Sequence, residues 1–225
     1  MPLPAPVPQR PSPPPLVAVV VVILTVVEDD LRVLLIKRSA EPFRDYWALP
    51  GGLLADGESL DRAAARKLLD ETGVQDVYLE QLYTFGELSR GPGSQRGIAV
   101  ANFALVQHEQ VRLRESETWQ PAWHSVFALP ALAFDNNAVV DYAVRRLRSK
   151  LDYTNVAYSL LPRQFTLSEL QQVYEAILDR PLDKRNFRRR MLSLDIIKPA
   201  GGTRMEGAHR PAALYAFAKR EPVQV

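Results

Sequence analysis

The stretch that decides the fold of the N-terminal part of this chain is residues 52–74, GLLADGESLDRAAARKLLDETGV. Ser59 is a favourable N-cap for a helix over residues 60–71, and Gly73 can take the left-handed conformation that ends such a helix. Glycines precede this helix, and a new strand-like run begins after it at Val77. The stretch predicts a loop, a helix and a second loop.

Apolar runs on both sides of this unit predict the strands of a sheet. Residues 16–27 are apolar except for Thr25, and residues 31–36 repeat the pattern after the acidic turn 28–30. The first run also has the length of a signal-peptide core. Its β-branched valines and the acidic residues that follow, without a small-residue cleavage site, favour a buried strand instead.

Further elements follow along the chain. Strands are predicted over residues 77–85 and 98–106, separated by a polar loop at 89–97. A helix is predicted over residues 136–151, with Asp135 as its N-cap. Its apolar stripe consists of Val139, Val140, Ala143, Val144 and Leu147. Strands that alternate with helices predict an α/β domain.

Composition limits the class of protein. The chain has 225 residues, of which 47% are hydrophobic and 24% charged, so we expect two domains with buried cores. Eight of the first fifteen residues are proline, which predicts a disordered tail over residues 1–15. The absence of cysteine excludes disulfides, thiolate zinc sites and a cysteine nucleophile. His108, His124 and His209 lack the spacing of metal ligands.

Charge is distributed unevenly along the sequence. Residues 1–158 carry 16 lysines and arginines against 19 acidic residues, whereas residues 159–220 carry 12 against 6. A basic C-terminal quarter on a mildly acidic body predicts a polyanionic partner.

The basic quarter has the element order of a winged helix-turn-helix. Thr166 and Glu169 fit a capping box for a helix to residue 178, and Asp183 caps a second helix over residues 184–194. Short strands at 196–198 and 213–217 enclose a wing loop at 201–204. Loop character between residues 153 and 162 places the boundary between a domain over 16–152 and one over 153–225.

The second helix carries a nearly single-signed basic face. Arginine and asparagine hydrogen-bond guanine and adenine edges in the major groove. A solvated helix face is the ordinary alternative, but the wing that follows favours double-stranded DNA. RNA is less favoured because exposed aromatic residues are not interleaved with the charges. The predicted DNA-binding residues are Lys184, Arg185, Asn186, Arg188, Arg189, Arg190, Lys198, Arg204 and Arg210.

Residues 52–74 resemble the Nudix box. The matching residues are Gly52, Glu58, Arg66, Leu68, Glu71, Gly73 and Val74, with Asp70 as a conservative replacement and WALPG at 47–51 as the lead-in. This resemblance implies an α/β/α sandwich. It also implies an enzyme that uses divalent metal to cleave nucleoside diphosphates linked to another group.

Position 67 departs from that pattern. Residues 67, 70 and 71 share one helix face, where three carboxylates would hold Mg²⁺. Lys67 replaces one carboxylate with an ammonium, so we predict no metal site and no efficient catalysis, with weak residual Mg²⁺-dependent hydrolysis as the alternative.

The pocket can still bind a diphosphate. The predicted ligand-binding residues are Arg38, Arg44, Trp47, Gly52, Glu58, Arg66, Lys67, Asp70, Glu71, Phe85 and Arg96. For the aromatic residues, the alternative role is to fill the core. For the arginines, the alternative is a solvated position on the surface.

A Nudix domain with an altered box followed by a winged helix-turn-helix resembles the Nudix-related transcriptional regulators (NrtR). The resemblance spans about residues 16–218 and rests also on residues 132–135 and on the run from 161–167 through 190–192. It implies a homodimeric repressor in the bacterial cytoplasm that binds a palindromic operator of NAD biosynthesis or salvage genes. ADP-ribose or a related nucleotide would release it, with no required cofactor and no membrane. Asn136 and Asn137 stand where better-known members of this family have histidine.

Two alternatives belong to other functional classes. The first is an active ADP-ribose pyrophosphatase tethered by its basic domain, with Glu115 or Glu117 supplying the missing carboxylate. The second is a protein-interaction module without a ligand. The persistence of Glu58, Arg66 and Glu71 in the box argues against the second.

Overall fold

The computed structural model describes residues 14–75, 77–86, 97–113, 120–205 and 211–224. Several predictions concern residues outside these ranges: the proline-rich tail up to residue 13, most of the loop at 89–97, Arg96, Glu115, Glu117, His209 and Arg210. Within the described ranges, no helix is long and apolar enough to cross a membrane.

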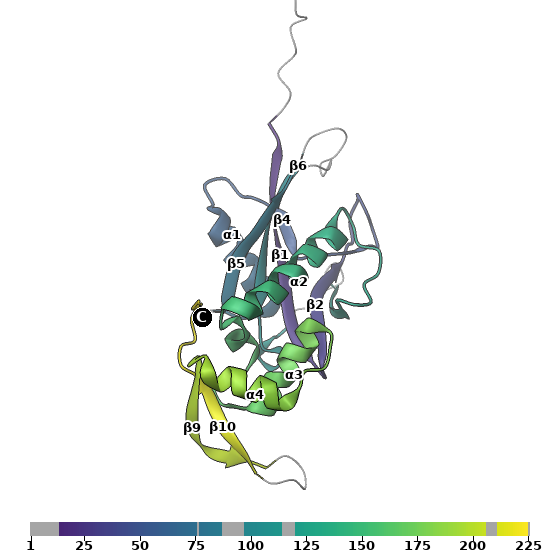
Figure 1. The fold of residues 1–225 in the computed structure, drawn as a ribbon. Helices are drawn as coiled ribbons and strands as arrows, with labels where there is room; N and C mark the ends of the chain where they lie inside the picture. Colours follow the sequence, from purple (N-terminus) through teal and green to yellow (C-terminus); the bar gives the residue numbers. More distant parts are fainter. Residues whose placement is uncertain (1–13, 76, 87–96, 114–119, 206–210, 225) are drawn as a thin grey trace, which may run out of the picture.

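A seven-stranded mixed sheet forms the centre of the N-terminal part (Figure 1). Its main path runs in the order β3-β2-β1-β6-β5, while β4 pairs with β1 and β7 with β2. Strand β6 pairs in parallel with β1 along the whole length of β6, from the pair Leu16–Gly97 to the pair Leu24–Leu105. The strands are β1 (Leu16–Val27), β2 (Asp30–Lys37), β3 (Trp47–Ala48), β4 (Gly51–Leu53), β5 (Tyr78–Phe85), β6 (Gly97–Leu105) and β7 (Gln120–Ser125).

Two helices, α1 (Leu60–Thr72) and α2 (Asn136–Tyr153), cover opposite faces of this sheet. Val21 of β1 belongs to the cluster under α1, and its neighbour Val22 to the cluster under α2. Successive side chains of a strand point to opposite faces, so a strand buried on both faces is apolar at nearly every position. This explains the continuous apolar run at 16–27 and confirms the predicted α/β/α sandwich.

The ends of the two helices differ in how well the sequence predicts them. Ser59 Oγ accepts a hydrogen bond from the Arg62 amide at 3.3 Å, and Gly73 ends α1 with φ of 69°. Asp135 occupies the predicted N-cap position of α2, but its side chain makes no cap hydrogen bond to the helix. Asp135 has a φ of −102° and ψ of 23°, which differs from the extended backbone usual at an N-cap.

The C-terminal part is a winged helix. It consists of β8 (Phe165–Thr166), α3 (Leu167–Leu178), α4 (Lys184–Ser193), β9 (Ile197–Arg204) and β10 (Ala212–Phe217), with the sheet order β8-β10-β9. The capping box of Thr166 and Glu169 is confirmed, and Asp183 Oδ1 accepts from the Asn186 amide at 2.8 Å. The predicted loop at 201–204 is wrong, because these residues extend β9. Antiparallel pairing of Thr203 with Ala213 lengthens the hairpin.

The junction between the two parts is buried. Loop character was expected between residues 153 and 162, but residues 154–161 are all buried and include the 3-10 helix η2 (Val156–Leu160). Val156 and Leu160 belong to the same apolar cluster as Val22 of the sheet and Leu170 of α3. The segment lacks the exposed backbone typical of a loop because its apolar side chains fill the space between the two parts.

Candidate functional site

A cavity of about 300 Å³ opens on the α2 side of the sheet, where β1 begins and α2 starts. The Arg38 guanidinium lies 5.0 Å from the centroid of the Phe134 ring, and its Nε donates to the Pro42 carbonyl at 2.9 Å. The guanidinium of Arg38, held over the Phe134 ring, thus forms part of the cavity wall. Its lining residues are Leu16, Ala18, Val20, Arg38, Pro42, Ala48, Leu49, Gly51, Gly52, Leu53, Phe134 and Asn136.

Phe134 and Asn136 were not predicted as site residues. Asn136 is 2% exposed, and its Oδ1 accepts a hydrogen bond from the Leu49 amide at 2.9 Å, which ties the start of α2 to the lead-in of the Nudix box. Phe134 has a φ of 58°, a conformation that a bulky residue rarely adopts. The sequence carried a signal at each position: Phe134 lies in the segment 132–135 that carries part of the family resemblance, and Asn136 stands where better-known members of the family have histidine.

Two glycines of β4 line the cavity, and the first of them is required for β4 to pack against β1. A Cβ on Gly51 would lie 2.7 Å from Val20 Cγ1 and 2.8 Å from the Val19 carbonyl, so only glycine lets β4 approach β1 this closely. A Cβ on Gly52 would lie 3.3 Å from Lys67 Cε and 3.6 Å from its Nζ. The Lys67 ammonium therefore lies against a residue that lines the cavity.

An ion pair between Arg66 and Glu58 holds the loop of the Nudix box against α1. Arg66 binds Glu58 in a bidentate ion pair, with Nε–Oε1 and Nη2–Oε2 distances of 2.8 Å, and this hydrogen bonding lowers the pKa of Glu58. Asp70 is exposed and lies 3.8 Å from Arg66 Nη1, while Glu71 is buried under α1. Within the described ranges, no three His, Asp or Glu side chains come together as a metal site.

Of the predicted ligand-binding residues that the structure describes, only Arg38 and Gly52 line the cavity. Arg44 pairs with Glu41 at 3.5 Å on the surface. The Trp47 ring packs edge-on against His124 at 4.5 Å, and Phe85 packs against Tyr83 at 5.3 Å. Both Trp47 and Phe85 contact the apolar core, which agrees with the core-filling alternative.

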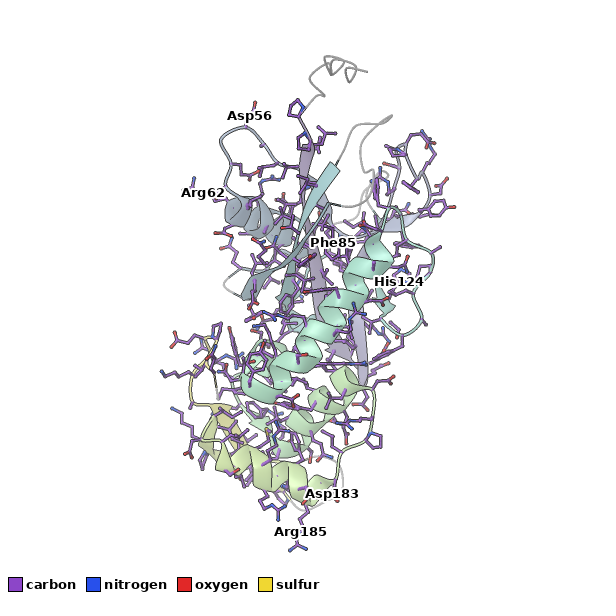
Figure 2. All side chains as sticks on the ribbon, turned by 45° about the horizontal axis from the view of Figure 1, so that its top comes forward. Asp56, Arg62, Phe85, His124, Asp183 and Arg185 are labelled. Atoms are coloured by element: carbon purple, nitrogen blue, oxygen red, sulfur yellow. The ribbon has the colours of Figure 1, made fainter. Side chains whose placement is uncertain are left out.

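The basic face of α4 lies at the other end of the molecule. Figure 2 shows Asp183 and Arg185 at the end opposite Asp56 and Arg62, with the Arg185 side chain extending away from the body. Phe187 and Met191 are buried beneath α4, whereas Lys198 is exposed on β9. The exposed residues of α4 include Lys184, Arg185, Asn186, Arg188 and Arg189. This amphipathic helix presents a positive surface suited to a DNA groove.

Two arginines predicted to bind DNA pair with the protein itself. Arg204 Nη1 lies 2.5 Å from Glu169 Oε1, and Nη2 donates to the Gln164 carbonyl at 3.1 Å. Arg190 Nη2 lies 3.5 Å from Asp152 Oδ1. The structure therefore gives Arg204 and Arg190 positioning contacts that the sequence did not reveal, because each partner lies 35 or more residues away.

Comparison with known proteins identifies both parts of the chain. The family model of the NUDIX domain matches residues 15–146, and that of the NrtR DNA-binding winged helix domain matches residues 157–217. The "ADPR responsive transcriptional repressor NtrR" of Acinetobacter baylyi is 38% identical over 205 residues, which cover 88% of this chain and 80% of the relative.

Solved structures extend the likeness to the whole architecture. Shewanella oneidensis NrtR complexed with a 27mer DNA matches with a TM-score of 0.79 and 35% identity, covering 89% of this chain and 93% of that one. The NUDIX domain of the same protein complexed with ADP ribose matches with a TM-score of 0.52 and 33% identity, covering 60% of this chain and 90% of that one.

Proposed function

We propose that this chain, which belongs to the family of Nudix-related transcriptional regulators (NrtR), is a transcriptional repressor that ADP-ribose releases from DNA. The observation that carries the proposal is the presence, in one chain, of an arginine-walled cavity beside the Nudix box and an exposed basic helix on a winged helix domain. We further propose that its targets are genes of NAD biosynthesis or salvage.

The DNA-binding step follows from the geometry of α4. A homodimer would present two such helices to the two halves of a palindromic operator, with half-sites about 10 bp apart or a multiple of this spacing. Exposed arginines on α4 would contact phosphates and base edges, while Phe187 and Met191 anchor the helix to α3 from below.

The effector site follows from the charges around the cavity. A diphosphate needs positive groups: Arg38 lies in the cavity wall, and Lys67 of α1 lies outside the cavity lining but close to Gly52, a residue of that lining. The Phe134 ring offers an apolar face for a base or ribose. We propose that ADP-ribose binds here and is bound rather than turned over.

The residues of α1 do not fit the divalent metal of Nudix enzymes. Lys67 carries a positive charge where a carboxylate ligand is required, and Asp70 lies 3.8 Å from the Arg66 guanidinium. A hard cation would lack one carboxylate ligand and would meet repulsion from Lys67. Lys67 would instead contact a phosphate of the nucleotide directly.

A modest coupling between the two sites is sufficient for regulation. If ADP-ribose favours an arrangement in which the two α4 helices no longer match the half-site spacing, a coupling of about 1–3 kcal/mol changes operator affinity about 5- to 150-fold.

Fluorescence anisotropy on DNA from the region upstream of the protein's own gene tests this proposal, with and without ADP-ribose. A salt-sensitive complex that ADP-ribose dissociates is the expected result. Tight binding that ADP-ribose leaves unchanged would refute the effector, and an absence of sequence preference would refute the repressor.

A further inference from the structure

The segment after β10, residues 218–224, lies outside both matched family regions and folds back onto the domain junction. Thr154, directly after α2, forms an antiparallel bridge with Gln224. Figure 1 accordingly shows the C-terminus beside the junction, away from the tip of the wing.

Asn155 is the centre of the contact between this segment and the junction. It is 2% exposed, and its Nδ2 donates to the carbonyls of Lys219 and Glu221, both at 3.0 Å. Its Oδ1 accepts from the Val223 amide at 2.9 Å, and its backbone amide donates to the Val223 carbonyl at 3.2 Å. The side chain uses two donor bonds and one acceptor bond, a combination that an amide provides and a carboxylate does not.

Arg220 makes a second set of contacts with the junction. Its Nη2 donates to the Tyr158 carbonyl at 2.6 Å and to the Leu161 carbonyl at 2.8 Å, while Nη1 donates to the Pro162 carbonyl at 3.1 Å. The Arg220 guanidinium thus donates hydrogen bonds to three carbonyls of the segment that links the two domains.

The opposite side of the junction is held by the Nudix domain. Gln107, which follows β6, donates its Nε2 to the Leu161 carbonyl at 2.8 Å, so this oxygen accepts bonds from both the Nudix domain and Arg220. Arg148 of α2 also donates its Nε to the Ile177 carbonyl at the end of α3, at 2.8 Å. The junction is therefore clamped between the Nudix domain and the C-terminal segment.

We propose that residues 218–224 are a clasp that joins the Nudix and winged helix domains into one mechanical unit, with Asn155 and Arg220 as its positioning residues. This inference rests on the proposed function, in which ADP-ribose bound to the Nudix domain weakens operator binding. A flexible junction would absorb a displacement at the nucleotide cavity. A clasped junction transmits it to α4, since packed interfaces shift between discrete arrangements rather than deform gradually.

Operator affinity with and without saturating ADP-ribose tests the clasp in the full-length Asn155→Asp and Arg220→Ala variants. Lys219→Ala is the matched control. It removes a positive charge from the same segment but keeps the backbone carbonyl that Asn155 binds.

The control should keep the wild-type ratio of the two affinities, expected at about 5- to 150-fold. In the two clasp variants this ratio should fall towards one, while ADP-ribose binding and ligand-free operator binding stay near wild-type values. Clasp variants that retain the full ratio would overturn the proposal.

Calorimetry gives a readout that does not need the effector. The clasped wild-type protein and Lys219→Ala should unfold in a single transition, and the clasp variants in two, because uncoupled domains unfold independently. If ADP-ribose leaves operator binding of the wild type unchanged, the proposed function fails. Calorimetry still tests whether the clasp couples the two domains. A single transition in every variant would then refute it.

Discussion

Replacement of Arg185 by alanine is the most direct test of the assignment of α4 as the recognition helix. Arg185 is exposed on α4, and its side chain extends away from the body (Figure 2). A guanidinium in this position contacts either a phosphate or a base edge when α4 enters the major groove. Arg185→Ala should therefore weaken operator binding while leaving ADP-ribose binding unchanged.

The magnitude depends on the kind of contact that is lost. A lost phosphate contact lowers the slope of log affinity against log salt by about 0.9, so a rise from about 50 to about 200 mM salt weakens the wild type about 3.5-fold more than the variant. A lost bidentate base contact costs about 1–3 kcal/mol and relaxes the preference at one base pair. Replacing both Arg185 and Arg188 should approximately double the change in slope.

Fluorescence anisotropy titrations at a series of salt concentrations measure affinity and slope together. Arg62→Ala is the matched control, because Arg62 is exposed on α1 at the opposite end of the molecule and carries the same charge (Figure 2). An Arg185→Ala variant with the same affinity, slope and base preference as Arg62→Ala would refute the assignment of α4.

Three further substitutions test separate parts of the structure. Arg204→Ala should leave the salt slope unchanged but lower the free energy of unfolding in urea by about 1 kcal/mol, because the partly exposed pair with Glu169 is lost; a changed slope would return Arg204 to the DNA-binding surface. Lys67→Glu should weaken metal-free ADP-ribose binding at least about tenfold in calorimetric titrations, since a charge-assisted phosphate contact contributes about 1.5–3 kcal/mol; unchanged affinity would remove Lys67 from the site. Burial opposes ionisation of Glu80, but hydrogen bonds from Lys150 and Tyr78 hold its pKa below the usual 4.5. The ionised Glu80 therefore stabilises the folded protein fully above about pH 4.5, and this stabilisation is lost as the pH falls through the lowered pKa. Glu80→Gln should therefore lower the melting temperature at neutral pH and flatten its decline in acid, and parallel curves for variant and wild type would contradict this.

Local patterns in the sequence predicted most of the secondary structure. Ser59, Thr166 and Asp183 cap their helices as expected, because a cap depends on residues only three positions apart. The apolar stripe of α2 and the run at 16–27 likewise marked which surfaces would be buried. The order of the elements and the Nudix box then determined the architecture.

The same local reasoning failed where long-range packing decides the outcome. Residues 154–161 contain no regular apolar pattern, yet they are buried because sheet, α3 and C-terminal segment enclose them. Gly201 and Gly202 indicated a loop, but they form an irregular step inside β9, because Thr203 and Arg204 beyond them pair with Ala213 and Ala212 of β10. The result in each case depended on a partner that is distant along the chain.

The sequence by itself determined that this protein joins a Nudix fold with an altered box to a basic winged helix, since spacing, caps and charge are properties of neighbouring residues. Only the tertiary structure decided which side chains share a site. It placed Phe134 and Asn136 around the cavity with Arg38, and it directed Arg204 to Glu169 rather than to solvent. The physical reason is that a cavity or an ion pair forms between segments brought together by burial of the core, and the sequence does not display those distances.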